Sequence, residues 1–566
     1  MSASSKKQLR KEQNLAALTE KQLQEKKEAK KLKIYTISFI LVIALIVGIG
    51  VGMLVRNVVV NSGMMQKTTA VKIGDHKLSA AELNYFYVDN IQEYYNYCKE
   101  SYGDSVDMYL AWLQGLTPSL PLDQQYYDTE KTVTWAEHFA NQSVSDAAAI
   151  YALYDEAIAK GHTLTEEELA NIDSNIEFYE MYAPMLGYKS FEDYLHQVYG
   201  AGSSVKTYRK HLEVNALAEN YYNAYADSLS YTDADFRAHE ADCYEEFNSY
   251  SYSYFYVNAE KFLNGGTTAE DGKITYSDEE IAASVEAAKA AAQSLVDSGA
   301  ADAAALKESI KQIPQLASFE EEEFFTQKDV LFANISGLSN VTADKIKEWV
   351  TDDARAAGDL TVFANERTTT AEDGTSTTTT SGYFVMMFEG VNENKMNLVN
   401  VRHILLAFEG GTTDQTTGET TYTEEEKKAA LDKANAVLDT YNAGEKTEDS
   451  FTALVADNSK DTGSVNNGGL YEDVYPGQMV EAFNDWCFDE ARQTGDVEIV
   501  ETEYGYHIMY YVGTSETIFR DFMIENTLRN NDVNEWYNAL VATVKPENVK
   551  IKYLNLDYIM NPNSQY

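Results

Sequence analysis

The chain has 566 residues and a formal net charge of -45 at pH 7, from 45 Lys and Arg against 90 Asp and Glu. This length is too great for a single core and predicts about three or four domains. The acidic balance disfavours a nucleic-acid partner because phosphates would be repelled, and three widely separated cysteines give no metal-ligand cluster, so no cofactor or metal is expected.

The N-terminus combines a basic tail with a long apolar run. Residues 1–33 hold ten Lys or Arg and four Glu, and residues 34–55 carry no charge. A run of this length can cross a membrane as a helix, and the basic flank places the N-terminus in the cytoplasm. A cleaved signal peptide is the alternative, but residues 56–67 match its small-residue cleavage site poorly. We therefore expect a single-pass protein of the cell membrane, with a stalk at 56–67 and the bulk of the chain outside the cytoplasm.

Residues 68–243 have the pattern of a mostly helical domain. Two short strands around a Gly-Asp turn lead to Ser79, which is expected to cap the first helix. Aromatic residues then recur at helical spacing, and Tyr is far more common among them than Phe. Such aromatics usually form a core, and the excess of Tyr also suits surfaces that are wet on one side and adhesive on the other.

An internal repeat organises the next part of the chain. The segments "WVTDDARAAGDL" (349–360) and "WCFDEARQTGDV" (486–497) share Trp, Asp, Ala, Arg, Gly and Asp in register, and each leads to an apolar strand opened by Gly-Tyr. We therefore predict two tandem α/β units at 244–390 and 397–514. A Thr-rich segment before Gly382 is expected to lengthen the final hairpin of the first unit.

The two predicted units differ in their histidines. The second has His403 on its first strand and His507 on its last strand, whereas the first has Tyr254 and Phe384 at the corresponding places. A lone histidine on an apolar strand is usually a core residue. Two histidines that occur together in one copy and are both absent from the other indicate one shared site.

The chain ends with an expected helix and strand at 515–566. The helix is amphipathic, and the strand "NVKIKYLNLDYI" is expected to pair with the early strand "AVKI" at 70–73. This C-terminal segment would therefore return to the helical domain at 68–243.

The second unit resembles the parvulin-type peptidyl-prolyl isomerases. The motifs "VRHILL", "SKDTGSVNNGG", "GQMVEAF" and "GDVEIVETEYGYHIMYY" occur in family order between residues 401 and 513. The whole layout is similar to the PrsA and SurA families of extracytoplasmic foldases. The resemblance implies an α+β multidomain protein with a single transmembrane helix, a helical chaperone domain at 68–243 and two parvulin-like units, of which the first (244–390) is degenerate and the second (397–514) carries the isomerase.

The resemblance assigns residues of the second unit by position. It places catalytic residues at His403, Asp461 and His507. It places substrate-binding residues at Met479, Phe483, Tyr471 and Thr502. Met479 and Phe483 match the residues that hold the proline ring, and Thr502 matches a hydroxyl that is hydrogen-bonded to a histidine. Tyr471 departs from the family, which has an apolar Leu at this place, so we expect a changed pocket wall.

The chemistry expected of such a site needs no metal or nucleotide. An X-Pro bond rotates through a barrier of roughly 18–20 kcal/mol because the twisted amide loses its resonance. We expect His403 and His507 to hydrogen-bond to each other and Asp461 to lie beside the substrate carbonyl. There Asp461 would either repel the oxygen as a carboxylate or donate a hydrogen bond when protonated. Cys487 follows a Trp in a helical run, and no activating pair marks it as a nucleophile. The sequence leaves a Cys98–Cys243 disulfide open.

These observations predict a membrane-anchored foldase that binds unfolded exported proteins and isomerises their X-Pro bonds. The alternative is a holdase or assembly scaffold in which both parvulin-like units only bind peptide. The expected partners are unfolded exported chains and the cytoplasmic membrane, with no nucleic acid. A homodimer is left open by the sequence.

Overall fold

The computed structural model describes residues 67–565 except 269–271, 371–373 and 414–419. The chain forms two compact units. One runs up to Ser230 and includes Thr462–Asn466 and the segment from Asn526 onward; the other comprises Tyr231–Asp461 and Asn467–Glu525. The predicted transmembrane segment at 34–55 lies outside the described residues. Among the helices that are described, none has the length and apolar character needed to span a bilayer.

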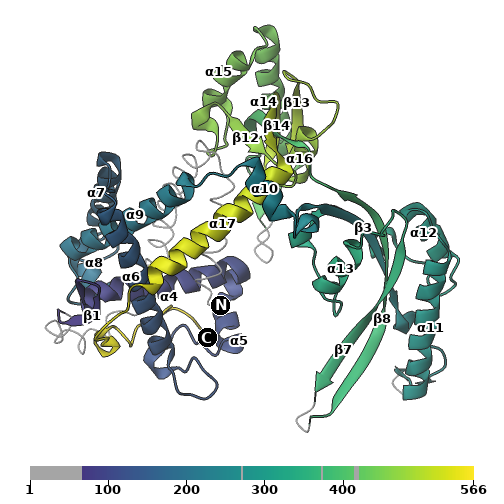
Figure 1. Cartoon of the computed structure of the whole chain (residues 1–566), viewed down its shortest axis with the longest axis horizontal. Coiled ribbons are helices and arrows are strands. Elements are labelled where there is room, and N and C mark those ends of the chain that lie inside the picture. The colour runs from purple at the N-terminus through teal and green to yellow at the C-terminus, as the bar shows by residue number, and fades with distance from the viewer. Residues whose placement is uncertain (1–66, 269–271, 371–373, 414–419, 566) are drawn as a thin grey trace. The chain divides into compact units, whose positions relative to one another are not determined.

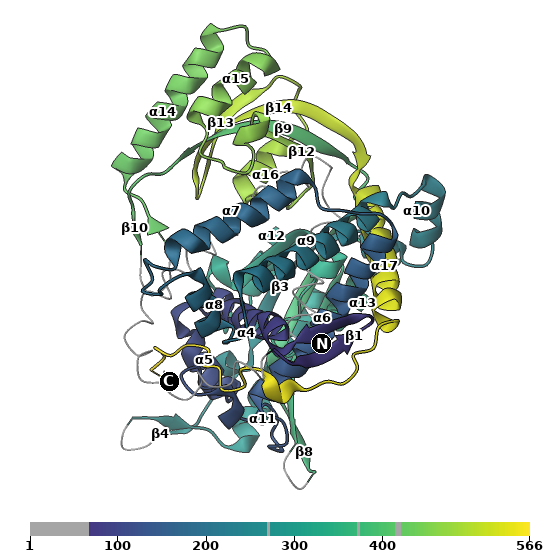
Figure 2. The same cartoon turned by 90° about the vertical axis from the view of Figure 1, so that its left-hand side faces the viewer.

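The first unit is helical, as its sequence pattern predicts (Figures 1 and 2). A short antiparallel pair, β1 (Thr69–Ile73) and β2 (His76–Ser79), precedes the helices. The helices are α4 (Ala80–Tyr102), α5 (Val106–Leu113), α6 (Trp135–Ala159), α7 (Glu166–Tyr182), α8 (Phe191–Val198) and α9 (Val205–Ser228). Ser79 caps α4 in a capping box with Glu82. Tyr85 and Tyr87 are fully buried in the core, so part of the tyrosine excess serves packing.

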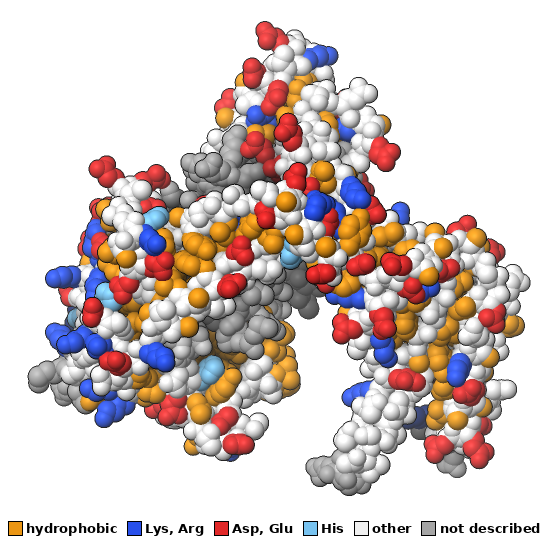
Figure 3. All heavy atoms as spheres, in the orientation of Figure 1, with side chains coloured by type: hydrophobic (Ala, Val, Ile, Leu, Met, Phe, Trp, Pro, Cys, Tyr) orange, Lys and Arg blue, Asp and Glu red, His pale blue; other side chains and the backbone are white. Residues whose placement is uncertain are grey.

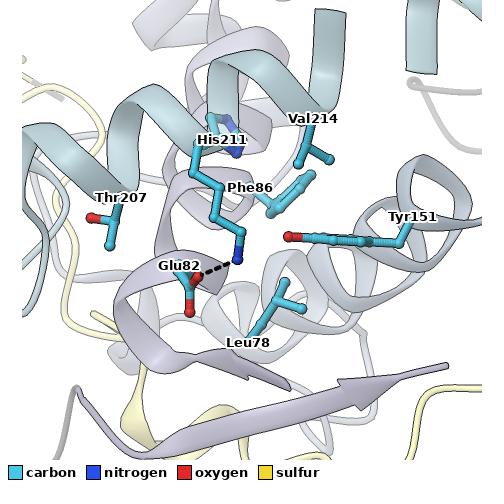
Figure 4. Close-up of a pocket in the computed structure, with 8 residues that line it drawn as sticks. Leu78, Glu82, Phe86, Tyr151, Thr207, His211 and Val214 are labelled. Atoms are coloured by element: carbon cyan, nitrogen blue, oxygen red, sulfur yellow. Dashed lines mark hydrogen bonds and ion pairs between the residues drawn. The ribbon is translucent and has the colours of Figure 1, made fainter. Parts of the chain in front are cut away.

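A small cavity lies among β2, α4, α6 and α9 (Figure 4). Its polar wall is the ion pair between Lys210 Nζ and Glu82 at 3.0 Å, with the ring of Tyr151 beside it. Hydrogen bonds from Ser79 and Lys210 hold the pKa of Glu82 below its usual range, although burial opposes this shift. The cavity volume of about 10 Å³ is near the lower limit for one water molecule. It is therefore too small to receive a peptide.

The C-terminal segment forms the predicted helix but not the predicted strand. Helix α17 spans Phe519–Ala542. The expected strand reduces to one isolated bridge between Lys72 and Glu547, with a further hydrogen bond from Lys550 N to Ala70 O, and then turns into a short 3-10 helix at Ile551–Tyr553. The C-terminal segment therefore contacts the early strand, as predicted, but it does not form the predicted strand.

The second unit contains two four-stranded antiparallel sheets. We call residues 249–392 the first module and 397–518 the second module. After α10 (Asp233–Glu240), the first module contains β3 (Ser249–Asn258), α11 (Asp278–Asp297), α12 (Ala303–Lys311), β6 (Phe324–Leu331), α13 (Ala343–Val350), β7 (Leu360–Thr370) and β8 (Ser376–Asn392). The second contains β9 (Asn397–Ala407), α14 (Glu424–Ala443), α15 (Glu448–Asn458), β12 (Leu470–Val474), α16 (Glu481–Cys487), β13 (Val497–Thr502) and β14 (Gly505–Ile518).

The two modules have the same topology, which confirms the predicted internal repeat. The strand order is β6-β3-β8-β7 in the first and β12-β9-β14-β13 in the second. Tyr254 pairs with Met386 in the first sheet, and His403 pairs with Met509 in the second. Met386 lies four residues after Gly382, and Met509 lies four residues after Gly505, so this register places Tyr254 at the position of His403. The same register matches Phe384 with His507.

Each module stacks an arginine on a tryptophan in the same way. The Arg355 guanidinium lies 4.6 Å from the Trp349 ring centroid in the first module, and Arg492 lies 4.1 Å from that of Trp486 in the second. In both modules the arginine Nε also donates to the backbone oxygen of its tryptophan, at 3.1 and 3.2 Å. This local structure explains why Trp and Arg recur in register in the two modules.

A glutamate near the start of the first long helix also recurs in both modules. Glu280 accepts a hydrogen bond from Gly266 N at 2.8 Å, and Glu426 accepts one from Gly411 N at 2.9 Å. Each glutamate also belongs to the capping box of its helix, α11 or α14. A single carboxylate thus joins each helix start to the loop that precedes it.

The Thr-rich segment lengthens the last hairpin of the first module, as predicted. Beyond Asn365, β7 and β8 continue to pair with each other as far as Thr370 and Ser376. Side chains on this extension are exposed, and the hydroxyl oxygens of Thr368 and Thr378 lie 2.9 Å apart. Figure 1 shows the extension as a long two-stranded ribbon.

Arg520, at the start of α17, is buried with only 1% of its surface exposed. Its guanidinium donates to the Glu240 carboxylate at 2.6 Å, to Asn248 Oδ1 at 2.9 Å, and to the backbone oxygens of Tyr244 at 2.7 Å and Glu393 at 3.2 Å. It also lies 3.7 Å from the ring centroid of Tyr244. One side chain therefore joins the segment that precedes the first module, the link between the modules and the helix that follows the second.

Candidate active site

The two histidines of the second module lie on neighbouring strands. His403 is on the central strand β9, and His507 is on β14, paired with Leu405. This diagonal relation brings two long side chains on one sheet face within reach. The two Nδ1 atoms are 3.0 Å apart, and the rings are nearly parallel, with centroids 5.2 Å apart. The predicted hydrogen bond between the imidazoles is present.

Asp461 reaches the site from the loop that follows α15. Ser459 fastens this loop to the central strand, because its hydroxyl oxygen accepts hydrogen bonds from the backbone N–H groups of Leu405 and Asp461. Lys460 N also donates to Leu405 O at 2.9 Å. These bonds place the Asp461 carboxylate 2.9 Å from His403 Nε2. Ser459 therefore has a structural role in the site, one that the sequence pattern does not indicate.

Thr502 completes the chain of polar groups at the turn between β13 and β14. Its hydroxyl oxygen lies 2.9 Å from His507 Nε2 and accepts a hydrogen bond from Tyr504 N at 3.2 Å. The turn requires Gly505, whose φ is +145° and whose Cβ, if present, would lie 2.3 Å from Leu406 O. The predicted contact between Thr502 and a histidine is present.

Tyr471 enters the site from the edge strand β12. Its hydroxyl donates to Asp461 Oδ2 at 2.9 Å, and its ring stacks on His403 with centroids 5.1 Å apart. Gly469 allows the strand to approach so closely, since its φ is +74° and a Cβ there would lie 2.4 Å from His403 O. Tyr471 thus contributes a hydroxyl that bonds to Asp461 and a ring that covers one side of His403.

Phe483 on α16 forms the apolar side of the site. It makes edge-to-face contacts with both imidazoles, at centroid distances of 5.4 Å to His403 and 5.4 Å to His507. Phe483 is buried, whereas Met479, just before the helix, is half-buried and packs on the same cluster. The structure therefore brings all seven predicted site residues of the second module together.

Burial divides these residues into two groups. His403 and His507 are 2% and 5% exposed, while Asp461, Tyr471 and Met479 are half-buried. Solvent therefore reaches the side chains of Asp461, Tyr471 and Met479, whereas the imidazoles are buried. His403 bonds to Asp461 and His507 bonds to His403, so the two histidines can hold the Asp461 carboxylate in place. The larger of two described cavities, about 360 Å³, lies elsewhere, at the end of β9 and the start of α14.

Burial also sets the ionisation of two groups in this module. It lowers the pKa of His507 to about 3, and the neighbouring His403 adds to the shift while Asp461 opposes it. His507 is therefore neutral near pH 7. Burial raises the pKa of the Cys487 thiol to about 12, which leaves it unreactive. Cys98, Cys243 and Cys487 are all free thiols, so the disulfide between Cys98 and Cys243 is absent.

The depressed pKa of His507 predicts that the second module loses stability in acid. Unfolded His binds a proton below about pH 6.5, whereas folded His507 does so only near pH 3, so stability falls as the pH drops through this window. The loss is at most about 1.4 kcal/mol per pH unit from this group. Urea unfolding at pH 7 and pH 5 measures it. A His507→Phe chain should show a smaller difference between the two pH values; an equal difference would contradict the assignment.

The first module has aromatic rings where the second has this polar chain. Tyr254 stacks on Phe325 with centroids 5.0 Å apart, and Phe384 lies against Tyr256 at 4.7 Å. Phe384 is buried. The first module therefore keeps the sheet but lacks the imidazole pair, as its sequence predicts.

The comparisons with known proteins point to the second module. Residues 383–512 match the family model described as the PPIC-type PPIase domain. The foldase protein PrsA of Caldanaerobacter subterraneus subsp. tengcongensis is 33% identical over 125 residues, which cover 20% of this chain and 40% of that protein. The chain therefore spans less than half of the length of this curated relative.

Two solved structures are also similar. The PPIase domain of TbPAR42 is 25% identical over 20% of this chain and 99% of its own, with a TM-score of 0.16. A peptidylprolyl isomerase, PrsA, from Bacillus cereus is 21% identical over 27% of this chain and 50% of its own, with a TM-score of 0.16. These TM-scores are low, so the assignment of the isomerase domain is based on the family model and the sequence match.

Proposed function

We propose that this chain, which carries a parvulin-type peptidyl-prolyl cis-trans isomerase domain at residues 383–512, is a foldase that binds unfolded exported proteins and isomerises their X-Pro bonds. One observation carries the proposal. The hydrogen-bonded chain of Asp461, His403 and His507 lies against the Phe483 ring inside that domain.

The proposed mechanism stabilises the twisted amide rather than breaking a bond. Met479 and Phe483 would hold the proline ring, since Met adapts its shape and Phe supplies a flat wall. Asp461 is the charged group that a substrate carbonyl would meet, and His403 holds it at 2.9 Å. A fixed carboxylate that repels the planar carbonyl and releases it on rotation would favour the twisted state over the ground state.

An isomerisation assay on X-Pro peptides with the whole chain tests this proposal. A catalysed rate well above the uncatalysed rate is expected. A rate equal to the uncatalysed background would leave the second candidate function, a holdase or scaffold that uses both modules only to bind peptide. One observation favours that second candidate: both histidines are buried.

The helical unit would bind the unfolded chain. Trp112 and Leu113 at the end of α5 are 74% and 73% exposed, and Met181 and Met185 are 62% and 71% exposed. Figure 3 shows hydrophobic side chains over much of the visible face of this unit. Large exposed apolar side chains are typical of surfaces that bind other polypeptides.

Replacing Trp112 and Leu113 together by serine is expected to weaken binding of an unfolded protein about tenfold or more. Burying one large apolar side chain contributes about 1.5–3 kcal/mol, and both side chains are already in solvent, so folding is unaffected. The dissociation constant for a permanently unfolded protein measures the effect. Ile158→Ser, at an exposed apolar position on α6, is the control. Unchanged affinity of the double variant would remove α5 from the binding surface.

The proposed location is the outer face of the cytoplasmic membrane, with a single anchor at 34–55 and the N-terminus in the cytoplasm. The charge-free run behind a basic tail supports this location. Protease added to cells with the outer surface exposed should degrade the chain beyond residue 56 and spare the tail. Complete protection would place the chain inside the cell.

A further inference from the structure

The polar groups of the second module form one continuous chain of hydrogen bonds. Thr502 Oγ1 lies 2.9 Å from His507 Nε2, the two Nδ1 atoms are 3.0 Å apart, and His403 Nε2 lies 2.9 Å from Asp461 Oδ2. Tyr471 donates its hydroxyl proton to that same Oδ2 at 2.9 Å. Each imidazole uses both of its nitrogens in this chain.

Two neutral imidazoles can share such a chain in only two directions. Either every proton points toward Asp461, or every proton points toward Thr502. A nitrogen-to-nitrogen bond needs one N–H group and one lone pair, so the tautomer of His403 fixes that of His507. His507 is neutral because burial lowers its pKa.

The geometry at the Thr502 end favours protons that point toward Asp461. In this direction the Thr502 hydroxyl donates to His507 Nε2 at 2.9 Å. In the opposite direction the hydroxyl would have to donate to Gly505 O at 3.5 Å, which is the long limit for such a bond. This end of the chain therefore favours the arrangement with the His507 proton on Nδ1 and the His403 proton on Nε2.

The geometry at the other end points to a role for Tyr471. We propose that Tyr471 is a positioning residue: its hydroxyl holds the ionised Asp461 carboxylate and thereby sets the direction of the whole hydrogen-bond chain. A carboxylate oxygen that accepts from both the phenol and the imidazole is stabilised in its charged form. The ring, stacked on His403 at 5.1 Å, keeps the phenol in place. This role rests on the proposed isomerase function of the site.

Tyr471→Phe tests the role because it removes only the hydroxyl and keeps the ring. The matched control is Tyr506→Phe, which removes a similar bond from a tyrosine to a carboxylate, the one between Tyr506 and Glu501 at 3.0 Å. Glu501 and Tyr506 form no part of the hydrogen-bond chain described above. Both variants are made in the whole chain.

The first readout is the tautomer of each histidine, measured by nitrogen NMR. The natural chain and Tyr506→Phe should show the proton of His403 on Nε2 and that of His507 on Nδ1. Tyr471→Phe should show mixed or reversed tautomers. A natural chain with the His507 proton on Nε2, or a Tyr471→Phe chain with unchanged tautomers, would overturn the proposal, whether or not the chain isomerises proline bonds.

The second readout is the isomerase kinetics. Tyr471→Phe should lower kcat about tenfold with little change in KM, and the acidic limb of its pH–rate profile should move to higher pH, because a carboxylate that loses a hydrogen-bond donor is protonated more easily. His403 and His507 are the titratable neighbours in the same chain of bonds. A higher KM with unchanged kcat would instead make Tyr471 a pocket wall. A natural chain without activity would refute the proposed function and leave the tautomer result standing.

Discussion

A chain carrying His507→Phe is expected to isomerise X-Pro bonds about 100-fold more slowly than the natural chain. His507 accepts from Thr502 and bonds to His403, so its loss frees His403 to turn and releases the restraint on Asp461. A displacement of about 1 Å at a reacting site can cost about that factor. The value of kcat/KM for an X-Pro peptide measures the loss.

Phenylalanine is a suitable replacement because Phe384 occupies this position in the first module. The fold therefore accommodates the ring, and circular dichroism in the aromatic region should confirm an intact structure. Phe384→Leu, the substitution at the equivalent position of the first module, is the control and should leave the rate unchanged. If His507→Phe retained most of the natural rate, the imidazole pair would have no part in catalysis.

Arg520→Met is expected to lower the free energy of unfolding of the unit at 231–461 and 467–525 by about 3–5 kcal/mol. The substitution leaves Glu240, itself 6% exposed, with the half-exposed Arg237 as its remaining partner, and removing the buried partner of a buried ion pair costs about this much. It also leaves the backbone oxygens of Tyr244 and Glu393 without this donor. Urea unfolding followed by tryptophan fluorescence measures the change.

Arg237→Met provides the matched control. Arg237 also pairs with Glu240 and contacts Asp521, but its side chain is 48% exposed. Exposed ion pairs contribute about 0–1 kcal/mol, so this variant should unfold close to the natural chain. Equal, small effects of the two substitutions would show that Arg520 does not join the segments around it.

The internal repeat allowed much of the second unit to be predicted. Two of its six shared residues form a recurring local structure, the stack of Arg355 on Trp349 and of Arg492 on Trp486. The matches of Tyr254 with His403 and of Phe384 with His507 therefore follow from sequence alone. The histidine pair, once found, also located Thr502 and Phe483 through the resemblance.

Other features depend on contacts that the sequence does not display. The bond from Tyr471 to Asp461 exists because Ser459 fastens the Asp461 loop to β9 and Gly469 lets β12 approach. No local sequence pattern predicts such a contact between a loop and a strand. The predicted terminal strand was wrong for a related reason: alternation of apolar residues predicted a strand at 548–559, but the described residues form one bridge to the early hairpin, at Glu547.

The loops that the two glutamates hold also have similar sequences: "GGTT" at Gly265, and again at Gly410, precedes a Tyr and an acidic helix start. In the structure, a Cβ on the second glycine would lie 2.8 Å from the ring of Tyr276 in the first module and 2.8 Å from the ring of Tyr422 in the second. The positive φ of these glycines and the close ring explain why Gly is required there. This similarity extends the repeat well beyond the segment that revealed it.

The stack of arginine on tryptophan in both modules makes the first module a useful control for the second. The first module has this stack, the glutamate that joins the helix start to the preceding loop, and the same strand order, but it has no histidine at either position of the pair. The first module is therefore an internal control that shares the solvent, temperature and concentration of the second module. A property that both modules share comes from their common fold. A property of the second module alone comes from its hydrogen-bond chain.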